Sequence, residues 1–153
     1  MSGQAQRWCS FLVLALCLGV SCAAKDLAVI VDKANGLDGM TTVDLAKVFK
    51  LDTHKWPDGR KVVLVLRDPS TPEMQTIIEK LYHMPPGEVK ALIAARRADV
   101  VIVDSEEQML KSVETIPGAI GVVDIYSISS RVKVLKVDAK LPLEQGYFLK
   151  VNR

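Results

Sequence analysis

The sequence lacks the residues that metal or thiol chemistry needs. Its three cysteines, Cys9, Cys17 and Cys22, all lie in the N-terminal apolar segment, so the remainder of the chain has no disulfide framework. The only two histidines, His54 and His83, have no second ligand at metal spacing. We therefore expect no metal site, no cofactor and no thiol catalysis.

The sequence also lacks a charge bias and the motifs of common enzymes. Twenty basic residues face 18 acidic ones, giving a net charge of +2 that is spread along the chain, which argues against nucleic acid as a partner. No G-x-S-x-G elbow and no glycine-rich phosphate loop occurs. The acids lie at helix starts and on polar helix faces, so the sequence predicts that the protein is not an enzyme. A hydrolase has only the abundance of acids in its favour.

The first 24 residues have the layout of a secretory signal peptide. Arg7 precedes the apolar run CSFLVLALCLGV, and small residues follow up to Ala24, which is too short for a membrane-spanning helix. Cleavage after Ala24 would leave one domain, residues 25–153. The alternative is lipidation, because Gly19-Val20-Ser21-Cys22 partly matches a bacterial lipoprotein box, with Cys22 as the acylated residue. Either route takes the protein out of the cytoplasm, to the periplasm, the medium or a lipid anchor.

Short apolar runs alternate with helical patterns along residues 25–153. This alternation predicts an α/β fold with a mostly parallel sheet flanked by helices. The expected strands are Leu27–Val31, Val62–Leu66, Val100–Val103, Ala119–Val123 and Val132–Val137, and the second and third, apolar on both faces, are expected at the centre of the sheet.

Capping boxes and apolar spacing predict the helices. Thr41 with Asp44 and Ser105 with Gln108 mark two helix starts. A third amphipathic helix follows Pro72, a fourth ends at Arg96-Arg97, and the apolar positions of the third are Met74, Ile77, Ile78 and Leu81.

The loop from Arg67 to Glu73 joins a strand end to a helix start, the place where α/β sheets bind ligands. Arg67, Ser70 and Thr71 could hold an anion there with a guanidinium and two hydroxyls. The alternative is structural: Ser70 or Thr71 caps the helix and Glu73 completes the capping box.

The segment ETIPGAIGVVD places Gly118 and Gly121 around a very apolar run. A strand gains nothing from a residue without a side chain, so both glycines need a backbone reason: a turn, a bulge or a close approach.

The ordered segments LAVIVDKAN, TTVDLAKVFK, KWPDGRKVVLVLRD, LYHMPPGEVKALIAARR and SVETIPGAIGVVD, with GYFL near the end, resemble one family. It is the phosphate-type substrate-binding protein of bacterial ABC transporters, in a short single-unit form. The resemblance implies a periplasmic-binding-protein-like (type II) single lobe plus hinge strands, with Gly118 and Gly121 at the hinge. It also implies binding of phosphate or a similar oxyanion by Arg67, Ser70 and Thr71.

This chain differs from the family's pattern in its anion loop and in its length. The family's anion loop reads R-x-x-S-G-T, whereas here Ser70 and Thr71 are adjacent, Pro72 follows, and Asp68 adds a negative charge. The length fits one lobe instead of two. Expected partners are a small oxyanion and an ABC permease or other envelope protein, with a homodimer as a further expectation. The alternative function is a non-catalytic envelope interaction module that has lost high-affinity ligand capture.

Overall fold

The core of the protein is a six-stranded sheet. A computed structural model describes residues 25–151, so the predicted signal peptide and Cys22 lie outside the described residues. The strand order is β4-β3-β5-β1-β6, and β8 pairs with the start of β1. The strands are β1 (Lys25–Asp32), β3 (Val63–Arg67), β4 (Val100–Val103), β5 (Ala119–Asp124), β6 (Val132–Val134) and β8 (Lys150–Val151).

Only β1 runs against the other strands of this sheet. It pairs antiparallel with β5, β6 and β8, while β3 is parallel to both β4 and β5. The prediction of a mostly parallel α/β sheet is therefore confirmed. One consequence is that the first residues of β1 lie at the same edge of the sheet as the last residues of β3, β4 and β5, which we call the carboxyl edge.

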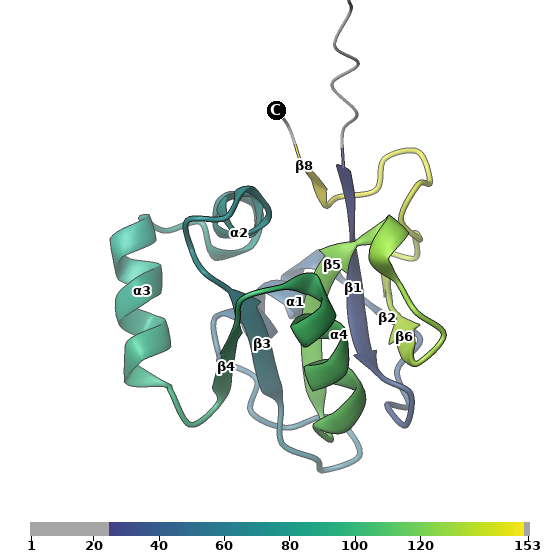
Figure 1. Cartoon of the computed structure of the whole chain (residues 1–153), viewed down its shortest axis with the longest axis horizontal. Coiled ribbons are helices and arrows are strands. Elements are labelled where there is room, and N and C mark those ends of the chain that lie inside the picture. Colours follow the sequence, from purple (N-terminus) through teal and green to yellow (C-terminus); the bar gives the residue numbers. More distant parts are fainter. Residues whose placement is uncertain (1–24, 152–153) are drawn as a thin grey trace, which may run out of the picture.

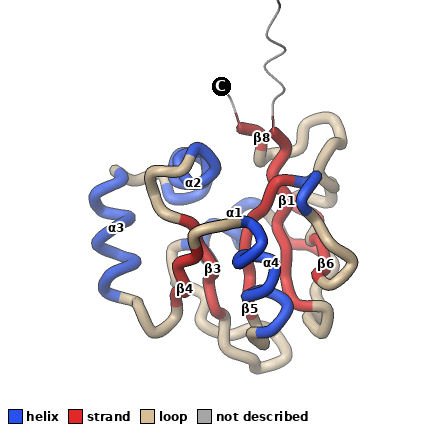
Figure 2. The backbone as a smooth tube through the Cα atoms, in the orientation of Figure 1, coloured by secondary structure: helices blue, strands red, loops and turns tan. Residues whose placement is uncertain are grey.

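Helices cover both faces of the sheet, as Figures 1 and 2 show. One face carries most of them, and the other carries α4, whose Met109 and Val113 pack on Ile30, Val65 and Val123. The helices are α1 (Thr42–Phe49), α2 (Pro72–Ile77), η1 (Ile78–Tyr82), α3 (Pro86–Ala95), α4 (Glu106–Thr115) and the short turn η2 (Ile125–Ser127). Two further strands, β2 (Gly39–Met40) and β7 (Lys136–Val137), form a small separate sheet.

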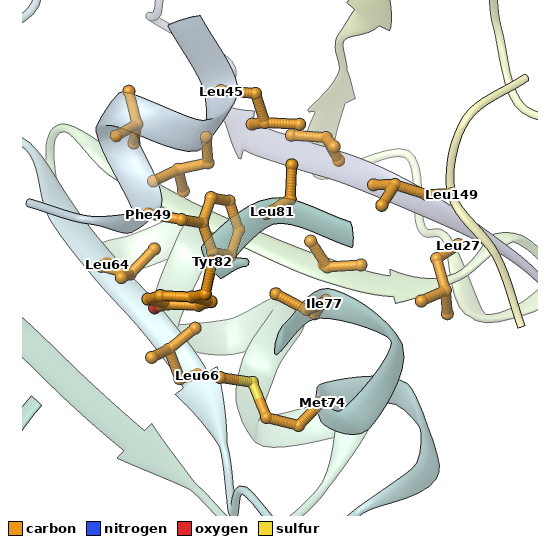
Figure 3. Close-up of a cluster of buried hydrophobic side chains, with 14 of the residues drawn as sticks. Leu27, Leu45, Phe49, Leu64, Leu66, Met74, Ile77, Leu81, Tyr82 and Leu149 are labelled. Atoms are coloured by element: carbon orange, nitrogen blue, oxygen red, sulfur yellow. The ribbon is translucent and has the colours of Figure 1, made fainter. Parts of the chain in front are cut away.

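The main core lies between the sheet and the α1, α2 and η1 helices, as Figure 3 shows. Alternate residues of β1 point into this core, because successive side chains of a strand point to opposite faces of the sheet. Phe49 and Tyr82 meet edge to face with their ring centroids 6.2 Å apart. A fully buried leucine, isoleucine or phenylalanine contributes about 1.5–3 kcal/mol of hydrophobic stabilisation, so this cluster is the main source of the fold's stability.

Two predictions about individual strands were wrong. The Val100–Val103 strand is not central: β4 is the edge strand, and Ile102 is 49% exposed. The Val132–Val137 run is not one strand: it divides into β6 in the main sheet and β7 in the small one.

The helix after Pro72 becomes a π-helix after Ile77. His83 N–H donates to the carbonyl of Ile78 at 3.2 Å, five residues back, and His83 has φ +50°. The wider turn brings Tyr82 into the core beside Leu81. An α-helical pattern alone does not predict that placement.

Candidate functional site

The predicted anion-binding residues lie at the carboxyl edge of the sheet. Arg67 is the last residue of β3, and Thr71 is the N-cap of α2. Ser70 lies in the exposed loop between them. The structure therefore brings the three residues to one place, at the strand end where α/β folds hold their ligands.

Arg67 is held by the protein itself. Its Nη2 donates to the backbone carbonyl of Asp104 at 3.1 Å, which ties the end of β3 to the end of β4. Its Nε is buried and has no hydrogen-bond partner among the described residues. The cavity next to it, lined also by Glu73 and Glu106, measures about 10 Å³. That volume is about one water probe, so an oxyanion would have to sit on the open edge.

The donors of Ser70 are occupied by a carboxylate of the same loop. Asp68 Oδ1 accepts the Ser70 N–H at 2.8 Å and the Ser70 hydroxyl at 2.5 Å. These two bonds, the hydroxyl first, hold the pKa of Asp68 below its usual value, with a smaller contribution from the charge of Lys90. Asp68 thus takes the position from which an anion's oxygen would receive these hydrogen bonds.

Thr71 acts as the cap of α2. Its hydroxyl donates to the carbonyl of Asp68 at 2.9 Å and accepts the Met74 N–H at 3.4 Å. Pro72 follows at the first helical position and has no N–H to offer. Of the two caps predicted, Thr71 is the one formed. The prediction that Glu73 completes a capping box was wrong, because Glu73 pairs with Lys25 instead, at 3.4 Å.

A second cluster of charges, missed at the level of sequence, covers the same edge. Lys25 Nζ lies 3.4 Å from Glu73 Oε1 and 3.6 Å from Asp124 Oδ2. Glu106, in the first turn of α4, accepts the N–H of Asp124 at 3.2 Å and the hydroxyl of Ser127. These contacts link residues up to a hundred positions apart, and no local pattern predicts them.

The carboxyl edge carries more acidic than basic side chains. Its cations include Lys25, Arg67 and Lys150, and its more numerous acids include Asp26, Asp68, Glu73, Asp104, Glu106 and Asp124. An excess of carboxylates repels a dianion, and water screens that repulsion only partly at contact distances.

Gly118 and Gly121 both have packing explanations within the lobe. Gly118 has φ +80°, and an added Cβ would lie 2.0 Å from the carbonyl oxygen of Lys61. Its own carbonyl accepts the indole N–H of Trp56 at 2.8 Å. Gly121 lies within β5, where an added Cβ would lie 2.5 Å from Met109 Sδ of α4. Gly118 precedes β5 at the opposite edge from Arg67, so a hinge role for either glycine stays a prediction.

His54 and His83 are both exposed. Over residues 25–151 no group of three or more His, Cys, Asp or Glu side chains is arranged to hold a metal ion. In the same range no helix is both long and apolar enough to cross a bilayer.

Comparison with solved structures gives the fold a close counterpart. An ABC-type phosphate transport receptor from Vibrio cholerae superposes with a TM-score of 0.70 at 19% identity, over 83% of this chain and 54% of that one. PstS from Borrelia burgdorferi gives 0.71 at 21% identity, over 84% and 55%. This chain has the fold of one half of such receptors. No family model and no curated protein matches it.

The match confirms, at the level of fold, the resemblance seen in the sequence. The chain spans about half the length of these two receptors. In the described residues, Lys25 and Val151 pair with each other at the carboxyl edge, so both ends of the lobe are at the edge that carries Arg67.

Proposed function

We propose that this chain is a non-catalytic, extracytoplasmic solute-binding lobe, and that its ligand is a small oxyanion of the phosphate kind. The supporting observation is the likeness of its fold to receptors described as phosphate receptors, combined with Arg67, Ser70 and Thr71 at the strand-to-helix junction. An ABC permease is the partner that such a receptor would serve. The acidic carboxyl edge and the open site make binding by a single copy weak.

The affinity follows from the charges and the solvent exposure. Arg67 shares its guanidinium with the carbonyl of Asp104, and phosphate must compete with the carboxylate of Asp68 for the Ser70 hydroxyl. The site is open to water, which weakens each new hydrogen bond. We expect a dissociation constant on the order of 1 mM.

Isothermal calorimetry of the purified protein with phosphate and with sulfate tests the proposal. Arg67→Ala should remove the binding heat, because it deletes the only guanidinium at the end of β3. Arg131→Ala is the matched control, since Arg131 is exposed and pairs with Glu114. Absence of heat with either anion up to about 10 mM would refute oxyanion binding.

A second function is favoured by the contacts of Asp68. A carboxylate that occupies the anion-facing donors is the arrangement expected of a lobe that has lost ligand capture and serves as an envelope interaction module. If the lobe is such a module, Asp68→Asn would not restore anion binding, although it removes the competing carboxylate. A co-purifying envelope protein that is lost when Asp104 is charge-reversed would support the module, because Asp104 is exposed on the carboxyl edge.

A further inference from the structure

The edge strand β4 has free hydrogen-bonding groups along its outer side. The carbonyl of Asp99 accepts the N–H of Leu64 in β3. Because N–H and C=O groups alternate in direction along a strand, those of Val100 and Ile102 point away from β3. In residues 25–151 no other strand pairs with β4 on that side.

The edge also lacks the features that usually prevent strand addition. The four residues of β4, VVIV, include no proline, lysine or other charge, and no bulge interrupts their pairing with β3. The Ile102 side chain is 49% exposed, although its neighbour across the pair, Leu66, is buried. An apolar strand with free backbone groups is a template for a further strand.

A groove runs between this edge and helix α3. Its volume is about 500 Å³, and it lies along the outer side of β4. Its lining includes Asp68, Lys90, Ile93, Arg97, Val100 and Ile102. A strand on one side and a helix on the other leave a slot of the kind in which extended peptides add to a sheet.

The position of α3 selects one extended segment over a second copy of the lobe. Figure 1 shows α3 beyond β4, on the side to which the sheet would have to extend. A second sheet joined edge to edge would meet α3 after its first strand. A single extended segment needs only the groove.

Two cations give the groove its charge preference. Lys90 and Arg97, both exposed, line the α3 side, and neither forms an ion pair within residues 25–151. The one acid of the groove, Asp68, keeps its negative charge, because the two hydrogen bonds that it accepts from Ser70 come from neutral donors. The two cations outnumber it, so an acidic side chain on the bound segment would face a net positive charge.

We propose that the β4 edge binds an extended, acid-containing peptide segment of a partner protein as an added antiparallel strand. In the bound peptide, one residue pairs with Ile102 and another with Val100, and both direct their side chains to the side of the sheet that carries α3. The first would be apolar, packing on Ile102 and Ile93, and the second would carry a carboxylate directed to Arg97. The groove adjoins the candidate anion site at Asp68, but the proposed interaction holds whether or not the protein binds phosphate.

The probe is a blocked synthetic pentapeptide, Thr-Val-Thr-Glu-Thr, titrated into ¹⁵N-labelled protein. In an antiparallel arrangement its valine pairs with Ile102 and its glutamate with Val100. We expect shifts of the Val100 and Ile102 amide signals and slower hydrogen exchange of both amides. Arg97→Glu should weaken binding about tenfold, and a peptide with lysine in place of glutamate should then bind better than the original.

The neighbouring arginine supplies a matched control. Arg96 is exposed and does not line the groove, so Arg96→Glu should leave the affinity within about twofold. The peptide methylated at the valine and glutamate nitrogens should not bind, because it cannot donate to β4. The proposal is overturned if neither amide shifts, if the methylated peptide binds equally well, or if Arg96→Glu and Arg97→Glu act alike. It is also overturned if light scattering shows a dimer in which the Val100 and Ile102 amides are already protected from hydrogen exchange without peptide.

Discussion

The carboxylate of Asp68 accepts both polar hydrogens of Ser70, the N–H at 2.8 Å and the hydroxyl at 2.5 Å, on a single oxygen, Oδ1. A bound oxyanion would need the same two donors. The chain therefore carries an internal competitor for its own candidate ligand, placed two residues before the serine.

The first prediction follows from that competition. Asp68→Asn removes a negative charge and weakens the hold on the Ser70 hydroxyl, so phosphate should bind about tenfold more tightly. Calorimetry measures the change. Asp104→Asn removes one charge from the same edge without touching Ser70 and should give a smaller gain. Equal gains would mean that general electrostatics, and not the Asp68–Ser70 contact, limits the affinity.

The second prediction separates the two glycines of the PGAIG segment. Gly118→Ala should destabilise the protein by about 3 kcal/mol or more, because φ is +80° and the new Cβ meets the Lys61 carbonyl. Gly121→Ala meets the flexible end of Met109, which can move, so the expected cost is about 1–2 kcal/mol. Urea unfolding ranks the variants. Gly36→Ala is the control, since an added Cβ there has no neighbour within 4 Å.

The third prediction concerns the buried hydroxyl of Tyr82. The side chain is 1% exposed, its hydroxyl has no hydrogen-bond partner among the described residues, and burial raises its pKa above the ordinary value. Tyr82→Phe keeps the edge-to-face contact with Phe49 and removes an unsatisfied polar group. Its free energy of unfolding should equal or exceed that of the wild type by up to about 1 kcal/mol. Tyr126→Phe, at an 84% exposed residue, should change nothing. A clear loss in Tyr82→Phe alone would mean that the hydroxyl is bonded in solution.

The fourth prediction is a pH dependence. Asp138 accepts the hydroxyl and the N–H of Thr42, and these bonds hold its pKa below the ordinary 3.8. A lowered folded-state pKa gives stability that is present above about pH 4 and lost as pH falls through the folded value. Asp138→Asn should therefore lose less stability than the wild type between pH 7 and pH 3. Asparagine also tolerates the φ of +50° at this position.

Unfolding curves at both pH values test the claim. Asp52→Asn, at an exposed residue, should keep the wild-type acid dependence. An unchanged acid limb in Asp138→Asn would show that the Thr42 contacts do not persist in solution.

The sequence predicted the elements whose signals are local. Apolar strands, the Thr41 and Ser105 caps and the proline at the start of α2 all follow from neighbouring residues, and the structure contains them. The order of strands within the sheet depends on contacts distant in sequence. Four consecutive apolar residues do not reveal whether a strand is central or at an edge, and Val100–Val103 was misplaced for that reason.

The candidate site was predictable only in part. The junction of strand and helix followed from the pattern around Arg67, but the partners of its donors did not. Lys25 reaches Glu73 across 48 positions, and this pairing depends on β1 running antiparallel to its neighbours. The sequence likewise does not show that Gly121 is required by Met109 and Val113, because α4 must first be placed on the sheet.

The last prediction joins ligand affinity to assembly. One lobe leaves its site open, so a hydrated dianion gains little on leaving water, and weak binding follows. A second copy laid over the carboxyl edge would exclude water and strengthen each hydrogen bond. Anion binding and dimerisation would then be linked, each favouring the other.

Phosphate titrations at several protein concentrations, with mass followed by light scattering, test this linkage. The apparent dissociation constant should fall as protein concentration rises, and phosphate should raise the average mass. Arg67→Ala should abolish both effects together, because the anion would no longer favour the paired state, whereas Arg131→Ala should retain both. Tight, micromolar binding by a strict monomer would contradict the linkage, since it would require a single open lobe to exclude water from its ligand.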